Sequence, residues 1–133
     1  MKEKLAKQAI AARENAYSPY SDFCVGAALL CDDGSIYTGS NIENSSFSAT
    51  ICAERAAFSK AVSEGKRDFS AIAIAGAKRG EDLLNPCYPC GVCRQVMSEF
   101  CDGDFKIYIV TENKVIEYTL SQLLPCSFEL KGE

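Results

Sequence analysis

The 133-residue sequence contains no histidine. Side chains other than imidazole must therefore bind any metal ion in this chain and accept any proton. No apolar run approaches the ~20 residues of a membrane-spanning helix, and the N-terminus "MKEKLAKQAIAAREN" lacks the apolar core of a signal peptide. We therefore expect a single cytoplasmic domain, residues 1–133, that has no membrane partner.

Positive charge is also scarce. The formal net charge is −4, and lysine and arginine form no cluster larger than those in "AKRG" and "GKRD". A protein that follows a nucleic-acid backbone normally presents a basic face. The composition argues against a nucleic-acid polymer as a ligand and favours a small molecule.

Cysteine is plentiful by comparison, with eight among the 133 residues. This share is below the ~8–10% of a typical disulfide scaffold. In a reducing compartment, spaced cysteines are metal ligands or catalytic groups more often than bridges. Cys24, Cys31, Cys101 and Cys126 stand alone in apolar or mixed stretches, and we interpret them as buried, small apolar side chains.

Hydrophobic periodicity predicts strands that alternate with helices. Helices are expected over 3–16, 51–65, 91–100 and 120–125, and strands over 25–31, 36–41, 69–77, 105–111 and 113–119. The turn "DDGS" joins the first two strands as a hairpin, whereas later strands are connected through helices. We predict an α/β fold with three layers, α/β/α, in which helices flank a mixed, mainly five-stranded sheet.

The stretch "PCYPCGVC" contains two overlapping CxxC pairs, formed by Cys87, Cys90 and Cys93. Cys52 lies at the start of one expected helix, and Cys90 and Cys93 lie at the start of the next. Because both helices follow loops after strands, their N-termini can meet at one edge of the sheet. The positive end of a helix dipole favours the thiolate form that a metal requires. Cysteines three residues apart also share one side of a helical turn, as two ligands of one ion must.

Glu54 and Arg55 follow Cys52 closely. Three cysteine thiolates leave one tetrahedral position of zinc for water and lower the pKa of that water to ~7. In a chain without histidine, Glu54 is the best-placed general acid and base, a role worth ~10²–10⁴ in rate. Three thiolates give the zinc site a net negative charge, so we expect Arg55 to donate to them and restore some positive character.

Two other interpretations stay open on these residues alone. If Cys87 joined Cys52, Cys90 and Cys93, four thiolates would close the zinc site, which would then be purely structural. A CxxC redox couple is the second, and it leaves Cys52 and Glu54 without a role.

The motifs "CAER" and "PCGVC" together resemble the cysteine form of the zinc deaminase signature. "YSPYSDFCVGAALL", "GSNIENSSF" and "LLPCSF" extend the similarity over nearly the whole chain, which resembles the small, homotetrameric form of the cytidine deaminases. In that family, "PCGxCRQ" matches only the second overlapping pair. The resemblance therefore assigns Cys52, Cys90 and Cys93 to one zinc ion per subunit.

The resemblance implies a hydrolase of pyrimidine salvage that deaminates cytidine and 2′-deoxycytidine to uridine and 2′-deoxyuridine, with release of ammonia. "NIEN" and the upstream phenylalanine favour a free nucleoside as substrate. Glu54 is expected to shuttle the proton from water to the base. The substrate contacts implied are Phe23 against the pyrimidine ring, Asn41 and Glu43 at the ribose hydroxyls, Ala53 beside the base, and Phe128 covering the base from a neighbouring subunit.

By the same resemblance we expect a homotetramer whose active sites are shared between subunits. Phe47 stands where relatives often have tyrosine, which removes one hydroxyl near the expected interface. A blasticidin-type deaminase shares "CAE" and "PCGxC", although "SNIEN" and Phe23 favour the nucleoside. The alternative from another class is the structural zinc module closed by four cysteines.

Overall fold

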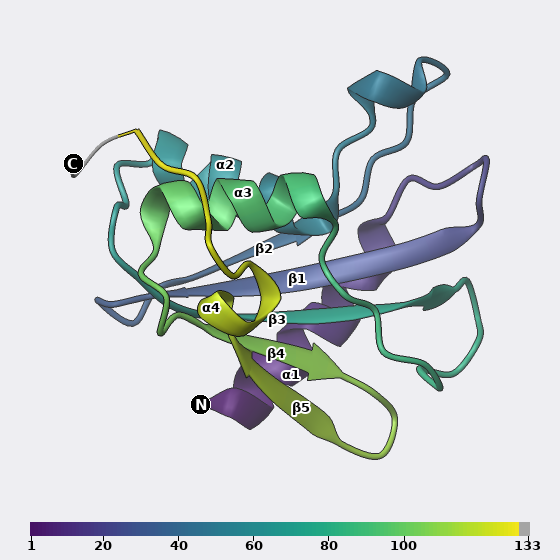
Figure 1. Cartoon of the computed structure of the whole chain (residues 1–133). Helices are drawn as coiled ribbons and strands as arrows, with labels where there is room; N and C mark the ends of the chain where they lie inside the picture. The colour runs from purple at the N-terminus through teal and green to yellow at the C-terminus, as the bar shows by residue number, and fades with distance from the viewer. Residues whose placement is uncertain (131–133) are drawn as a thin grey trace.

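A five-stranded sheet in the order β2-β1-β3-β4-β5 forms the middle layer of the structure, a computed structural model that describes residues 1–130 (Figure 1). Strand β1 pairs antiparallel with both β2 and β3, β3 runs parallel to β4, and β4 pairs antiparallel with β5. The sheet is therefore mixed, as the sequence predicts. The strands are β1 (Phe23–Cys31), β2 (Ile36–Ser40), β3 (Phe69–Lys78), β4 (Lys106–Val110) and β5 (Val115–Thr119).

Helices cover both faces of the sheet, which confirms the predicted three layers. Helix α1 (Lys2–Ala12) lies on one face, whereas α2 (Ala53–Ser63) and α3 (Gly91–Phe100) lie on the other (Figure 1). The short helix α4 (Leu120–Leu123) follows β5 directly. Within residues 1–130, no helix has both the length and the apolar character needed to cross a bilayer.

The two faces of β3 carry side chains of different size. Ile72 and Ile74 belong to the core under α2 and α3, whereas alternate alanines of the same strand face α1. Small residues let α1 approach the sheet closely: a Cβ added to Gly26 of β1 would lie 2.0 Å from the carbonyl oxygen of Ala9. Because both faces of β3 are buried, the strand has no polar side in its sequence.

Several element boundaries differ from the sequence-based expectations. The first helix ends at Ala12 and continues only as the 3₁₀ turn Arg13–Asn15. Strand β1 begins at Phe23 rather than at residue 25, because Phe23 still pairs with Lys78 of β3. The second helix begins at Ala53 because Cys52, its N-cap, has extended backbone. A further 3₁₀ turn, Phe47–Ala49, was not expected.

The interpretation of the four isolated cysteines is confirmed for Cys24 and Cys31, which are buried. It is wrong for Cys126, which is exposed. Cys126 follows α4 and has a φ of 55°, so the chain turns there along the surface instead of entering the core. Cys101, at the end of α3, is only partly buried but packs against the main core.

Candidate metal centre and active site

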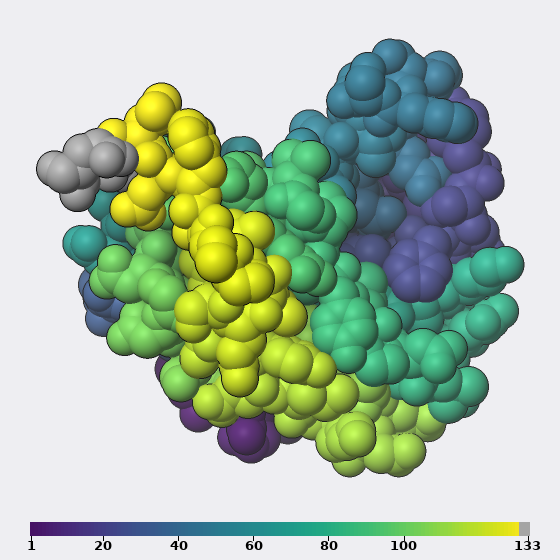
Figure 2. All heavy atoms as spheres, viewed as in Figure 1, coloured from purple at the N-terminus to yellow at the C-terminus, as the bar shows by residue number. Residues whose placement is uncertain are grey.

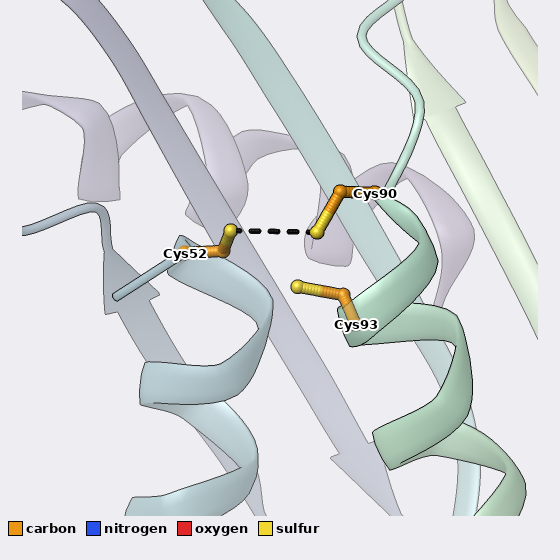
Figure 3. Close-up of side chains that lie close together, drawn as sticks. All are labelled: Cys52, Cys90 and Cys93. Carbon is orange, nitrogen blue, oxygen red and sulfur yellow. Dashed lines mark hydrogen bonds between the residues drawn. The ribbon is translucent and has the colours of Figure 1, made fainter. Parts of the chain in front are cut away.

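The structure brings three of the predicted ligands together at the starts of α2 and α3 (Figure 3). The Sγ atoms of Cys52, Cys90 and Cys93 all lie within 4.8 Å of one another. Cys52 is the N-cap of α2 and Cys90 is the N-cap of α3, so the positive ends of both helix dipoles point at the group. Figure 3 shows the three side chains converging on the space between the two helices.

This donor set fits zinc. A tetrahedral ion with Zn–S bonds of ~2.3 Å places neighbouring sulfur atoms ~3.8 Å apart. The Sγ atoms of Cys52 and Cys90 are 3.7 Å apart, which matches that spacing. Among the residues that the structure describes, the metal-ligating group contains these three cysteines and does not include Cys87. The geometry therefore favours a three-cysteine site over one closed by four.

Electrostatics favour a thiolate at Cys52. A hydrogen bond from the Cys93 thiol, with further ones from Arg55 and Cys90, lowers the pKa of Cys52 to about 5. Nη2 of Arg55 lies 3.4 Å from the Sγ of Cys52 and 3.4 Å from the carbonyl oxygen of Thr50. The expected position of Arg55 beside the thiolates thus agrees with the structure. The Nε atom of Arg55 is buried and has no hydrogen-bond partner among the described residues.

Glu54 is buried in the first turn of α2, with only 4% of its surface exposed. Burial, together with the charge on Cys52, raises the pKa of Glu54 to about 7. A carboxyl group with such a pKa can both take up and release a proton near neutral pH, as a general acid and base must. Ala53, which precedes Glu54, is fully buried.

Asn41 and Glu43, the expected ribose-binding residues, hold the backbone around the start of β1. The Asn41 side chain accepts a hydrogen bond from the Val25 N–H (2.9 Å) and donates to the Phe23 carbonyl oxygen (2.8 Å). The Glu43 carboxylate accepts hydrogen bonds from the backbone N–H groups of Tyr20 (2.9 Å) and Ser21 (3.2 Å), and also from the Ser21 hydroxyl. These bonds, that of the Ser21 hydroxyl above all, lower the pKa of Glu43.

Sequence reasoning missed the contribution of Tyr20 and Ser21. With Glu43, Phe47 and Thr50 they line an open cavity of about 420 Å³. The rings of Tyr20 and Phe47 meet edge to face at 6.1 Å between centroids. The motif "YSPYSDF" contained these residues, but their contacts depend on a bridge between Tyr17 and Ile42 that no local pattern predicts.

The two expected aromatic contacts are both accessible. Phe23 is 36% exposed at the start of β1, and Phe128 is 67% exposed in the C-terminal segment. The carbonyl oxygen of Phe128 accepts a hydrogen bond from Nε2 of Gln95 (3.2 Å), which fastens this segment to α3. Figure 2 shows a hollow in the surface between α3 and the projecting segment that follows β2.

Comparisons with known proteins agree with this geometry. Residues 1–110 match the model of the cytidine and deoxycytidylate deaminase zinc-binding region. The chain is 52% identical over 128 residues to the cytidine deaminase of Halalkalibacterium halodurans, covering 96% of this chain and 93% of the relative. It is 51% identical over 127 residues to that of Sporosarcina psychrophila, covering 95% and 90%. The crystal structure of cytidine deaminase from Burkholderia pseudomallei superposes with a TM-score of 0.87 at 40% identity, covering 96% of this chain and 99% of that one.

Proposed function

The chain belongs to the cytidine and deoxycytidylate deaminase family, and we propose on this basis that it hydrolyses cytidine and 2′-deoxycytidine to uridine and 2′-deoxyuridine, with release of ammonia. The observation that carries the proposal is the group of three cysteine sulfurs beside the buried carboxyl of Glu54. Neither a redox couple nor a closed structural site accounts for that carboxyl. The relatives named cytidine deaminase also favour the nucleoside over a blasticidin-type substrate.

Cys52, Cys90 and Cys93 would hold one zinc ion. Zinc bound there would supply an activated water, with a pKa lowered to ~7, as the nucleophile. Glu54 accepts one proton from the attacking water and delivers it to N3 of the pyrimidine. It then accepts the remaining proton of that water, from the new hydroxyl on C4, and delivers it to the departing amine. A new C4–O bond replaces the C4–N bond, and ammonia leaves.

Arg55 supports this chemistry from the side of the thiolates. Its guanidinium donates to the Sγ of Cys52, which reduces the negative charge that three thiolates place on the site. Arg55 therefore tunes the charge of the ligands without taking part in proton transfer.

Phe23 packs against the pyrimidine ring, and Ala53 lies beside the base. Asn41 and Glu43 bind the ribose hydroxyls with the hydrogen-bonding capacity that their backbone contacts leave free: the second N–H of the Asn41 amide and a remaining lone pair of the Glu43 carboxylate. A carboxylate at the sugar suits a nucleoside, because it would repel a phosphate group there.

Phe128 completes the site from a neighbouring subunit. Its exposed ring, on a segment joined to α3 by the Gln95 hydrogen bond, suits a contact with another chain better than a contact within its own. We therefore propose a cytoplasmic homotetramer with shared active sites that acts in pyrimidine salvage on free nucleosides and binds no nucleic acid.

The variant Glu54→Gln tests the assignment. We expect it to keep its zinc and its fold. Its rate of cytidine conversion should fall ~10²–10⁴-fold, as it does when a general acid and base is removed. Glu64→Gln is the matched control, because Glu64 lies at the other end of α2, where its carboxylate accepts a hydrogen bond from the Tyr37 hydroxyl. Full turnover by Glu54→Gln at normal zinc content would refute the role of Glu54.

A further inference from the structure

Cys87 belongs to the "PCYPCGVC" stretch but lies outside the group of metal ligands. Its side chain is partly buried and packs against the core under α2 and α3. There it lies directly over Gly76 of β3: a Cβ added to Gly76 would be 2.7 Å from the Sγ of Cys87 and 3.0 Å from its Cβ. Real Cβ atoms essentially never make contacts as short as 2.7 Å, so a side chain at position 76 would force the Cys87 thiol or the strand to move.

The ring of Phe23 uses the same space. Its Cε2 atom would lie 3.0 Å from the same added Cβ. Ile72 and Ile74 fill the face of β3 under α2 and α3, and since side chains alternate along a strand, Gly76 is the next position of that row. The missing side chain at Gly76 is what admits the Phe23 ring and the Cys87 thiol together.

Cys87 also lies near the proposed reaction centre. Burial, followed by the negative charges of Glu54 and Cys52, raises the pKa of Cys87 to about 12. The thiol is therefore neutral at physiological pH and acts as a small apolar wall. Its Sγ and the Cε2 atom of Phe23 both lie beside Gly76.

We propose that Cys87, with the missing side chain at Gly76, is a positioning residue that fixes the Phe23 ring against the pyrimidine base. This inference rests on the proposed function, since that function assigns the base to Phe23. The size of the side chain at position 87 then sets the width of the base-binding part of the site. A larger side chain at 87 or 76 drives the ring towards the base, and a smaller one at 87 lets the ring retreat.

Four variants test this relationship: Gly76→Ala, Cys87→Ala, Cys87→Leu and the double variant Gly76→Ala/Cys87→Ala. We expect Gly76→Ala and Cys87→Leu each to raise the KM for cytidine and the Kd for uridine about tenfold, because both overfill the same space. In the double variant, removal of the Sγ should restore most of the affinity. Zinc content should stay at the wild-type value and kcat within about threefold of it, because the metal ligands and Glu54 are untouched.

Cys101→Ala is the matched control, because Cys101 is also partly buried against the same core and lies at the far end of α3. It should lower stability without changing KM. NMR spectra of ¹³C-labelled phenylalanine rings give a readout independent of turnover. The Phe23 resonances should move in Gly76→Ala and return towards their wild-type positions in the double variant.

Failure of Cys87→Ala to restore affinity and ring position in the Gly76→Ala background would overturn the proposal. Variants at position 87 that change kcat or zinc content in place of KM would also overturn it. If Gly76→Ala does not fold, Cys87→Ala and Cys87→Leu still decide between these results. If the wild type binds uridine but does not convert cytidine, the proposed function alone is refuted. The Kd and NMR measurements on the variants then still test the positioning role of Cys87. A wild type that binds neither nucleoside contradicts both.

Discussion

Nη2 of Arg55 lies 3.4 Å from the Sγ of Cys52, one helical turn away at the start of α2. The contact places a fixed positive charge beside the expected zinc ligand whose pKa is lowered. A hydrogen bond donated to the sulfur withdraws negative charge from it. A site with three thiolates can therefore still bind an electron-rich nucleophile and its substrate.

Replacement of Arg55 should therefore weaken catalysis more than folding. For Arg55→Gln we expect kcat to fall about tenfold or more, the cost of losing one charge-assisted hydrogen bond at the reaction centre. The comparison variant is Lys60→Gln, on the same helix, where the Nζ of the lysine donates to the Thr38 carbonyl oxygen. Steady-state kinetics with zinc analysis of both variants would show this. Unchanged kcat and zinc affinity in Arg55→Gln would exclude the charge-tuning role.

Arg94 should hold in place the loop that leads into Cys90, one of the expected zinc ligands. Its Nε donates to the carbonyl oxygen of Pro89 (2.8 Å), directly before Cys90, and its Nη1 donates to that of Leu123 (2.7 Å) in α4. Hydrogen bonds from a charged donor contribute ~1.5–3 kcal/mol each, so loss of both in Arg94→Gln should lower the free energy of unfolding by about 3–6 kcal/mol. It should also speed the release of zinc to a chelator.

Arg67→Gln provides the comparison for Arg94, because Arg67 also donates to two carbonyl oxygens, those of Val62 and Lys66, but on the exposed surface. Urea unfolding and chelator kinetics should separate the two variants clearly. Equal, small effects in both would mean that Arg94 contributes no more than a surface arginine.

Zinc should protect three thiols and stabilise the fold. Because zinc binds the folded site, free zinc at 100 times its Kd should stabilise the native state by ~2.7 kcal/mol. Thiol titration of the native protein should count three fewer reactive cysteines with zinc than without, and differential scanning calorimetry should show a higher Tm. Protection of four thiols would instead bring Cys87 into the metal sphere.

Asp33 should stabilise the protein in a pH-dependent way. Its hydrogen bonds with Lys66 first, and with Ser35, lower the pKa of Asp33 well below its ordinary value of 3.8. A lowered folded-state pKa means that the stabilisation is fully present above the unfolded-state pKa of ~3.9 and is lost as the pH falls below it. Asp33→Asn should therefore lower Tm at pH 7, with a difference from wild type that shrinks towards pH 3. Asp82→Asn, at an exposed position, serves as the control; a difference independent of pH would contradict the argument.

Much of the site could be predicted because it depends on local rules. Cys52 and Cys90 are helix N-caps, and Cys93 lies one turn after Cys90, so the sequence spacing alone brings the ligands to two helix ends. The resemblance decided between the overlapping pairs, and the 3.7 Å separation of Cys52 and Cys90 agrees with that choice.

The remaining features depend on contacts between distant segments. The order of the strands rests on β1 pairing with β3 across the intervening α2, which no local pattern encodes. Asn41 and Glu43 are polar residues after a strand, and nothing in their sequence shows that their side chains hold the backbone near Phe23 and Ser21. Cys126 is exposed at a point where the chain has a positive φ, which the preceding proline does not impose.

The most direct test of the central claim is the ultraviolet progress curve of cytidine mixed with metal-free protein as zinc is added stepwise. The three-cysteine site predicts that conversion to uridine rises with zinc and saturates at one ion per chain, with one ammonia released for each uridine formed. Tight binding of one zinc ion per chain without any conversion of cytidine would contradict it, because the site would then be structural and the buried carboxyl of Glu54 would have no water to act on.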